Sequence, residues 1–132
     1  MMELRRVLLV DDDRLVLVFF KHILGHAFDP HLAVGADEAL DAIVTQGSFP
    51  VVISDLRMPE MSGVDLISKV KDSCPETVCV LLSGDVESDE ARDAFQRGLA
   101  FRLLPKPCQA RLLVETVEDA FRQYEASRAS SE

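Results

Sequence analysis

Val51-Val-Ile-Ser-Asp-Leu-Arg-Met-Pro-Glu-Met-Ser-Gly63 is the segment of the chain most informative about its architecture. It opens with an uninterrupted run of β-branched residues and then changes to polar and turn-forming residues after Ser54. A short apolar run bounded by turn residues is typical of a strand buried on both faces. Ser62 follows and can cap a helix over Val64–Lys71. The segment therefore predicts a strand, a loop and a helix in succession.

The same change from an apolar run to an amphipathic stretch occurs five times along the chain. The other predicted strands are Arg6–Val10, His31–Val34, Thr77–Leu82 and Ala100–Leu104, and the other predicted helices are Asp13–His26, Ala36–Thr45, Asp85–Arg97 and Gln109–Tyr124. Five strand-then-helix units predict a doubly wound α/β fold, a five-stranded parallel sheet with helices on both faces. Residues 125–132 are polar, and we expect a tail or the start of a linker there.

Composition and charge exclude several classes of function. The 132 residues amount to one domain, with 48% hydrophobic and 28% charged residues. The formal net charge is −9, and no basic run is present, so direct nucleic-acid binding is not expected. The longest apolar run, Leu15–Phe20, is too short to insert into a membrane, and no signal peptide is apparent. We therefore expect a cytoplasmic protein.

Cysteine usage agrees with a reducing compartment. The chain has three cysteines, Cys74, Cys79 and Cys108, without any metal-binding spacing, and we expect three reduced thiols. Cys108 follows Pro107 at the predicted start of the last helix, a position that can lower the pKa of a thiol.

Five polar residues lie where predicted strands end. Asp11 and Asp12 follow the first strand, Asp55 the third, Ser83 the fourth and Lys106 the fifth. Each alone is compatible with a cap, a turn or a solvated loop. In a doubly wound sheet, however, the ligand crevice lies beyond the carboxyl ends of the strands. We therefore expect these side chains to converge on one site.

Three carboxylates in one crevice require a cation or a proton, because like charges a few ångströms apart resist joint ionisation. Carboxylate and carbonyl oxygens, without histidine or cysteine, favour Mg²⁺, Ca²⁺ or Mn²⁺. No EF-hand loop is present in the sequence, which favours Mg²⁺ with water and phosphate as further ligands.

Four motifs together resemble the receiver domains of two-component response regulators, from Val7 to about Phe121. They are Val7-Leu-Leu-Val-Asp-Asp12, Ser54-Asp-Leu-Arg-Met-Pro-Glu-Met-Ser-Gly63, Leu82-Ser-Gly84 and Pro105-Lys-Pro107. The resemblance implies a flavodoxin-like fold of strand order 2-1-3-4-5, with a receiver domain over residues 1–124. It also implies a signalling switch rather than an enzyme acting on a separate substrate.

The resemblance further implies a role for each strand-end residue. Asp55 is the phosphoacceptor, and Asp11, Asp12, Asp55 and the backbone carbonyl of Arg57 hold Mg²⁺, with Asp11 acting through a metal-bound water. Lys106 pairs with the phosphoryl oxygens, and the Ser83 hydroxyl hydrogen-bonds one of them. The donor is a sensor histidine kinase or a phosphotransfer protein. The output is an unidentified effector domain or downstream protein, and a homodimer is compatible with this reading.

Some positions depart from the usual receiver pattern. Leu103 stands three residues before the lysine, where receivers often carry Tyr or Phe as a switch residue, and Phe101 lies two residues earlier. Phe101 and Leu103 are therefore candidate switch-region residues. Arg57 and Asp85, two residues past Asp55 and Ser83, are candidate residues for tuning the lifetime of the phosphoryl group. They either pair across the mouth of the crevice or remain two independent solvated side chains.

The first predicted helix carries more apolar residues than its buried face requires. Its predicted core-facing stripe is Val16, Phe20, Ile23, Leu24 and Ala27. Leu15 and Val18 fall elsewhere on the helix, with His22 at the next turn. Two interpretations remain open: shielding by neighbouring loops, or a docking surface for the kinase, since receivers commonly present this helix beside the acidic pocket.

Two alternatives to the phosphorylated switch are weaker. Small-molecule aspartyl phosphohydrolases often carry a second Asp two residues after the nucleophile, but this chain has Arg57 there and no cap domain. A degenerate receiver that serves only as a phosphorylation-independent binding module is disfavoured by the intact acidic residues and Lys106. The sequence is compatible with a free-standing receiver or with part of a larger regulator.

Overall fold

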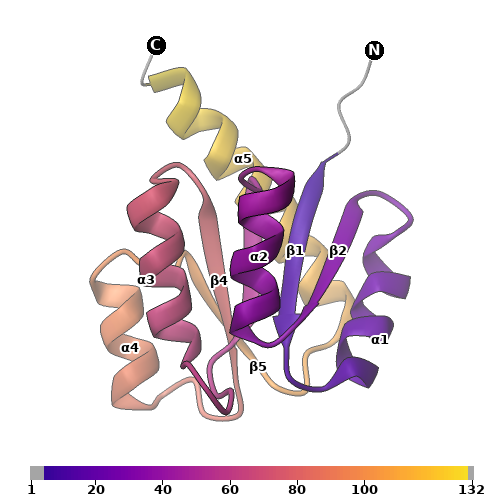
Figure 1. Cartoon of the computed structure of the whole chain (residues 1–132), viewed down its shortest axis with the longest axis vertical. Coiled ribbons are helices and arrows are strands. Elements are labelled where there is room, and N and C mark those ends of the chain that lie inside the picture. The colour runs from indigo at the N-terminus through magenta and orange to yellow at the C-terminus, as the bar shows by residue number, and fades with distance from the viewer. Residues whose placement is uncertain (1–4, 131–132) are drawn as a thin grey trace.

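The computed structural model describes residues 5–130 (Figure 1). Its elements are β1 (Arg6–Asp11), α1 (Arg14–Leu24), β2 (Asp29–Val34), α2 (Ala36–Gln46), β3 (Val51–Asp55), α3 (Gly63–Ser73), β4 (Val78–Ser83), α4 (Asp89–Gln96), β5 (Arg102–Pro105) and α5 (Ala110–Ser130). All neighbouring strands are parallel, in the order β2-β1-β3-β4-β5. The predicted doubly wound α/β fold and its strand order are confirmed.

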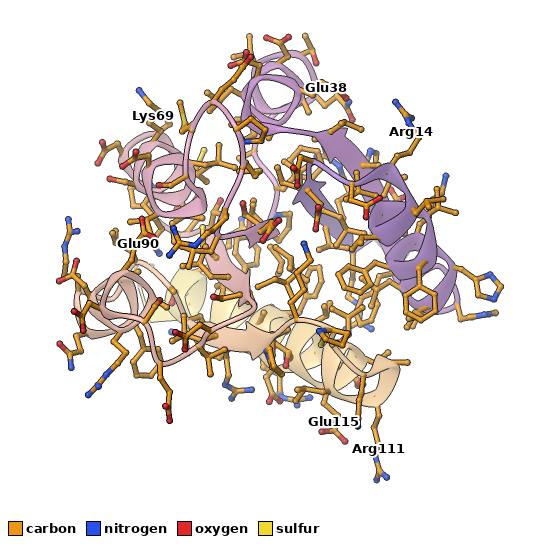
Figure 2. All side chains as sticks on the ribbon, turned by 90° about the horizontal axis from the view of Figure 1, so that it is seen from below. Arg14, Glu38, Lys69, Glu90, Arg111 and Glu115 are labelled. Atoms are coloured by element: carbon orange, nitrogen blue, oxygen red, sulfur yellow. The ribbon has the colours of Figure 1, made fainter. Side chains whose placement is uncertain are left out.

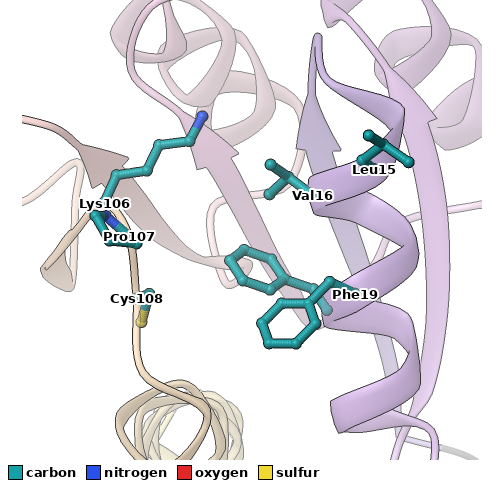
Figure 3. A pocket seen from close by; sticks show the side chains of 7 residues that line it. Leu15, Val16, Phe19, Lys106, Pro107 and Cys108 are labelled. Carbon is teal, nitrogen blue, oxygen red and sulfur yellow. The ribbon is translucent and has the colours of Figure 1, made fainter.

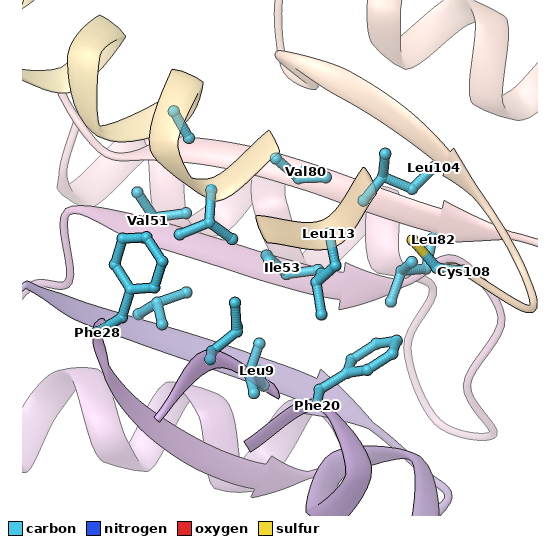
Figure 4. Close-up of a cluster of buried hydrophobic side chains, with 14 of the residues drawn as sticks. Leu9, Phe20, Phe28, Val51, Ile53, Val80, Leu82, Leu104, Cys108 and Leu113 are labelled. Carbon is cyan, nitrogen blue, oxygen red and sulfur yellow. The ribbon is translucent and has the colours of Figure 1, made fainter. Parts of the chain in front are cut away.

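The sheet separates two hydrophobic cores, because successive side chains of a strand point to opposite faces. In β3, Val51 and Ile53 pack toward α1 and α5 (Figure 4), whereas Val52 packs toward α2, α3 and α4. The three central strands β1, β3 and β4 are buried almost throughout. Their continuous apolar runs therefore reflect burial on both faces, and polar residues are confined to the strand ends.

Side-chain caps set where three helices begin. Asp13 accepts a hydrogen bond from the Leu15 amide, and the predicted cap Ser62 accepts one from the Asp65 amide. Ser88 caps α4, so this helix begins at Asp89 and not at the predicted Asp85. The acidic residues before Ser88 form the β4–α4 loop instead.

The first helix is shorter than predicted, and its buried face differs from the predicted stripe at two residues: Val16, Phe20, Ile23 and Leu24 pack in the core as predicted, but Leu17 was omitted and Ala27 was wrongly included. It ends at Leu24, two residues before the predicted His26, because Gly25 forms its C-cap. Leu17 is fully buried in α1, whereas Ala27 lies beyond the helix and is exposed. The buried stripe is therefore Leu17, Phe20 and Leu24, with Val16 at its margin.

The last helix is longer than predicted. It continues six residues past Tyr124, so residues 125–130 are helical, and residues 131–132 lie outside the described part. Glu125, Ala126 and Arg128 are good helix formers, which allows the helix to continue despite the polarity of the segment. None of the helices within residues 5–130 is long and apolar enough to cross a membrane.

Candidate functional site

The acidic residues gather at the carboxyl ends of β1 and β3. These strands are neighbours, and the chain leaves them in opposite directions, toward β2 and toward β4, so a crevice opens between them. Asp11 ends β1 and is 1% exposed, Asp55 ends β3 and is 6% exposed, and Asp12 follows β1 and faces solvent. One carboxylate oxygen from each of the three lies within 4.8 Å of the others. The predicted convergence of these side chains is confirmed.

Lys106 reaches this group from the end of β5. Its ammonium nitrogen lies 2.9 Å from Asp11 Oδ2 and 2.9 Å from Asp55 Oδ2. The backbone amide of Lys106 donates a 2.9 Å hydrogen bond to the Ser83 carbonyl, which ties the lysine to the end of β4. The lysine therefore joins residues that are 95 and 51 positions away in the sequence.

The electrostatics of the pocket favour a further cation. Burial raises the pKa of Asp11, and the charge of Asp55 adds to the rise, although the Asp13 amide and Lys106 oppose it. Burial would lower the pKa of Lys106, but hydrogen bonds to Asp55 and Asp11 outweigh it and raise the pKa. One ammonium group thus faces three carboxylates. Because all the ligand atoms are oxygens, the group fits a hard divalent cation.

The β3–α3 loop folds back onto Asp55. The Gly63 amide donates a 2.7 Å hydrogen bond to the Leu56 carbonyl, and the Leu56 amide donates one of 2.8 Å to the Leu82 carbonyl. A Cβ atom on Gly63 would lie 2.2 Å from the Asp55 carbonyl oxygen. Only glycine fits this close approach. Gly63 therefore supports the position of Asp55, a role that the sequence motif alone did not reveal.

Arg57 projects from this loop and forms an ion pair with Glu90 of α4, Nη1 to Oε1, at 3.6 Å. The predicted pairing with Asp85 is wrong, because the Asp85 carboxylate turns back to accept a hydrogen bond from the Glu87 amide. Figure 2 looks onto this edge of the sheet, where Glu90 extends from α4 and Glu38 from α2. Arg57 is 76% exposed at its side chain, so the pair lies at the rim of the crevice.

Ser83 ends β4 with its hydroxyl directed into the β4–α4 loop. The hydroxyl donates to the Asp85 carbonyl at 2.9 Å and accepts from the Asp85 amide at 3.0 Å. Of the candidate switch-region residues, Leu103 is half-buried on the α2–α3–α4 side of the sheet, and Phe101 is half-buried against the α1–α5 core. The Arg102 guanidinium carbon lies 4.8 Å from the centre of the Phe101 ring.

An apolar cleft of about 480 Å³ runs from α1 to Lys106 (Figure 3). Its lining residues are Leu15, Val16, Phe19, Phe20, Lys106, Pro107 and Cys108. Leu15 is 79% exposed and Val18 is 52% exposed, so neighbouring loops do not shield them. Phe19, 54% exposed, extends the same surface and was missed, although its spacing of four residues from Leu15 places both on one side of the helix.

The position of Cys108 before α5 does not lower the pKa of its thiol. Cys108 is buried in the α1–α5 core two residues before α5 begins, and burial raises the pKa of its thiol. Burial also raises the pKa of the Cys79 thiol, to about 12. All three cysteines are free thiols, as predicted.

Residues 7–118 match the family described as Response regulator receiver domain. This chain belongs to that family. The receiver is 31% identical over 118 residues to the DNA-binding transcriptional regulator NtrC of Klebsiella pneumoniae, covering 89% of the chain and 25% of NtrC. It is 32% identical to the regulatory protein YesN of Bacillus subtilis, covering 86% of the chain and 32% of YesN. The chain thus spans about a quarter to a third of the length of these relatives.

Solved structures agree with the receiver assignment. A CheY-like response regulator receiver domain protein from Methanospirillum hungatei superposes with a TM-score of 0.87 at 26% identity, covering 95% of this chain and 99% of that one. The family match identifies this receiver as a signalling module, and its acidic pocket is of the kind that binds Mg²⁺ in receivers.

Proposed function

We propose that this receiver accepts a phosphoryl group on Asp55 from a histidine kinase or a phosphotransfer protein and signals through the resulting change of its surface. One observation carries the proposal: the Lys106 ammonium lies 2.9 Å from both Asp55 and Asp11, with the Asp12 carboxylate beside them. This arrangement places a carboxylate nucleophile next to the positive charge that phosphoryl transfer requires.

The transfer follows from the two oxygens of Asp55. Lys106 contacts Oδ2, which leaves Oδ1 to attack the phosphorus atom of a phosphohistidine on the donor. A new O–P bond forms as the P–N bond breaks, and the electron pair of that bond stays on the imidazole nitrogen. Lys106 then offsets the charge of the phosphoryl oxygens. Such transfer depends mainly on positioning and charge neutralisation, and a buried carboxylate supplies the positioning.

Asp11, Asp12, Asp55 and the backbone carbonyl of Arg57 would hold Mg²⁺. When bound, the ion neutralises negative charge on the phosphoryl oxygens and on the carboxylates that surround them. The surplus of carboxylates over the single ammonium of Lys106 supports this assignment.

Ser83 supplies the conformational response. Its hydroxyl is held by the backbone of Asp85, so it must leave both of those hydrogen bonds to reach a phosphoryl group on Asp55. The new dianion favours that exchange because a charged acceptor forms a stronger hydrogen bond than a carbonyl. The β4–α4 loop then loses its anchor at Ser83, and the surface of α4 and β5, where Leu103 and Phe101 lie, changes with it.

The exposed residues of α1 support docking of the phosphoryl donor. Leu15, Val18 and Phe19 present apolar side chains, and the cleft beside them leads to Lys106. A helical donor that packs there would carry its phosphohistidine close to Asp55. We propose a cytoplasmic signalling pathway in which the output passes to an effector domain or a downstream protein, as the name of the relative NtrC suggests by analogy. A homodimer of the receiver is a further candidate for the form that carries this output.

The experiment is phosphorylation by acetyl phosphate, with and without Mg²⁺, read by intact-protein mass spectrometry. We expect one phosphoryl group on the wild type with Mg²⁺ and none on Asp55→Asn. Asp72→Asn, an exposed carboxylate change on α3, is the matched control and should label normally. Asp12→Ala should raise the Mg²⁺ concentration that is needed. An unlabelled wild type would favour the phosphorylation-independent binding module instead.

A further inference from the structure

Two histidines lie side by side at the end of α1, away from the acidic pocket. His22 lies in the last turn of the helix, and His26 follows it by four residues. The two ring centroids are 5.8 Å apart, and the rings meet edge to face at 76°. His26 lies in the turn that follows the helix, and the ring contact shows that both imidazoles project to the same side; both residues are exposed.

Within residues 5–130, the ring nitrogens of this pair make no hydrogen bond to the rest of the protein. Neither side chain takes part in an ion pair with the described residues, and their interaction in this part of the chain is the contact between the two rings. His31 differs, because its Nε2 lies 3.0 Å from Asp29 Oδ2 and its ring packs edge-on against Phe49. The described chain therefore has one histidine held by its neighbours and two whose nitrogens can take a ligand.

We propose that His22 and His26 together bind a divalent transition-metal ion, with Zn²⁺, Cu²⁺ and Ni²⁺ as the chemical class. Imidazole nitrogen suits these ions, and two imidazole rings whose centroids are 5.8 Å apart are close enough to reach one ion. The rings must turn about their side-chain bonds to converge, which costs little for exposed side chains. Two imidazoles fill two positions of a tetrahedral site, and water fills the others.

The position on the helix favours a cation. The C-terminal end of α1 carries the negative end of the helix dipole, and the whole chain has a formal net charge of −9. The pair also differs in ligand chemistry from the acidic pocket, whose oxygens prefer Mg²⁺. The two sites are therefore selective for different ions, and the histidine site does not depend on the proposed phosphorylation.

The location gives such an ion a role in partner binding. His22 lies four residues after Val18 and seven after Leu15, so the three side chains form one stripe along the exposed side of α1. The bound ion lies at the C-terminal end of this stripe. Its water-filled positions face outward, where a histidine or carboxylate of a docked partner can replace a water.

The test is titration of the full chain with ZnCl₂ in excess Mg²⁺, followed by the histidine side-chain resonances in NMR spectra. We expect the resonances of His22 and His26 to move together with one-to-one stoichiometry while those of His31 stay in place. His22→Gln and His26→Gln should each weaken Zn²⁺ binding by about tenfold or more, because the second imidazole acts at an effective concentration on the order of millimolar.

His31→Gln is the matched control and should keep the wild-type Kd. A single variant, His22→Gln or His26→Gln, that binds Zn²⁺ as tightly as the wild type would overturn the proposal, and so would movement of His31 alone. Both substitutions lie on exposed side chains, and circular dichroism establishes that the variants remain folded. Loss of phosphorylation on Asp55 would leave these readouts unchanged, so the two proposals fail separately.

Discussion

Gly63→Ala should damage both the stability of the receiver and its phosphorylation. The new Cβ would lie 2.2 Å from the Asp55 carbonyl oxygen, whereas ordinary contacts begin at 3.4 Å, so the loop and α3 must separate by about 1.2 Å. Overpacking costs about 1–3 kcal/mol, and the hydrogen bond from the Gly63 amide to Leu56 adds about 0.5–1.5 kcal/mol if it breaks. The more restricted unfolded chain of the alanine variant offsets about 0.4–1 kcal/mol. A net loss of about 0.5–4 kcal/mol follows.

The assay has two parts, urea unfolding and the initial rate of labelling by acetyl phosphate. With a slope of about 1–3 kcal/mol per molar urea, the unfolding midpoint should fall by roughly 1 M. Displacement of a nucleophile by about 1 Å slows transfer by about 100-fold. Gly84→Ala is the control, because a Cβ at Gly84 meets nothing within 4 Å. Wild-type stability in Gly63→Ala would refute the steric argument, and wild-type labelling of a destabilised variant would refute the link to Asp55.

Three further predictions concern the surface. Leu15→Glu should slow transfer from a histidine kinase but not from acetyl phosphate. The control is Val44→Glu, a change at an equally exposed apolar site on α2, which should affect neither reaction. Equal slowing of transfer from both donors would contradict docking at α1. Arg57→Ala should speed loss of phosphate from Asp55 by up to about fivefold, because an exposed ion pair contributes about 0.2–1 kcal/mol. A double-mutant cycle with Glu90→Ala tests whether the two side chains act together, and additive effects of the two substitutions would exclude it. Hydrogen bonds from Arg102 and Arg122 lower the pKa of Asp119 below 3.8, so its contribution to stability is present above that pH and is lost as the pH falls. Urea unfolding should therefore show Asp119→Asn to be less stable than wild type at pH 7, with a difference that shrinks as the pH falls below 3.8. A difference that grows in acid would contradict this sign.

The convergence of the site was predictable because strand ends are easy to locate in this sequence. The apolar runs that precede Asp11 and Asp55 end abruptly, and parallel strands share one carboxyl edge. Lys106 could be added because it follows the fifth run. The strand order, which makes β1 and β3 neighbours, rested on the family resemblance rather than on the pattern of residues.

The burial of Leu17 was not predictable, since six consecutive residues, Leu15–Phe20, are apolar. A helix that is apolar on every side has no unique buried stripe in its sequence, and the packing against β1 and α5 decides that Leu17 faces inward. The same property leaves Leu15 and Phe19 exposed. These exposed apolar residues form the surface on which the docking proposal rests.

The partner of Arg57 depended on where α4 begins. Asp85 was placed at the rim because it lies two residues past Ser83, but Ser88 caps α4, so the helix begins at Asp89, four residues later than the predicted Asp85. Glu90 then falls in the first turn of α4, within reach of Arg57. A change of cap is a local difference of about 1 kcal/mol, and it decides which acidic residue of α4 lies within reach of Arg57.

The length of α5 has a mechanical consequence. A 21-residue helix is about 31 Å long, and its near end follows directly on the loop that carries Lys106. If the helix moves as a rigid body, a tilt of about 5° at Ala110 displaces Ser130 by roughly 3 Å. A rotation of α5 by a few degrees at its start, beside the loop of Lys106, would therefore appear at the far end as a movement about as long as a hydrogen bond.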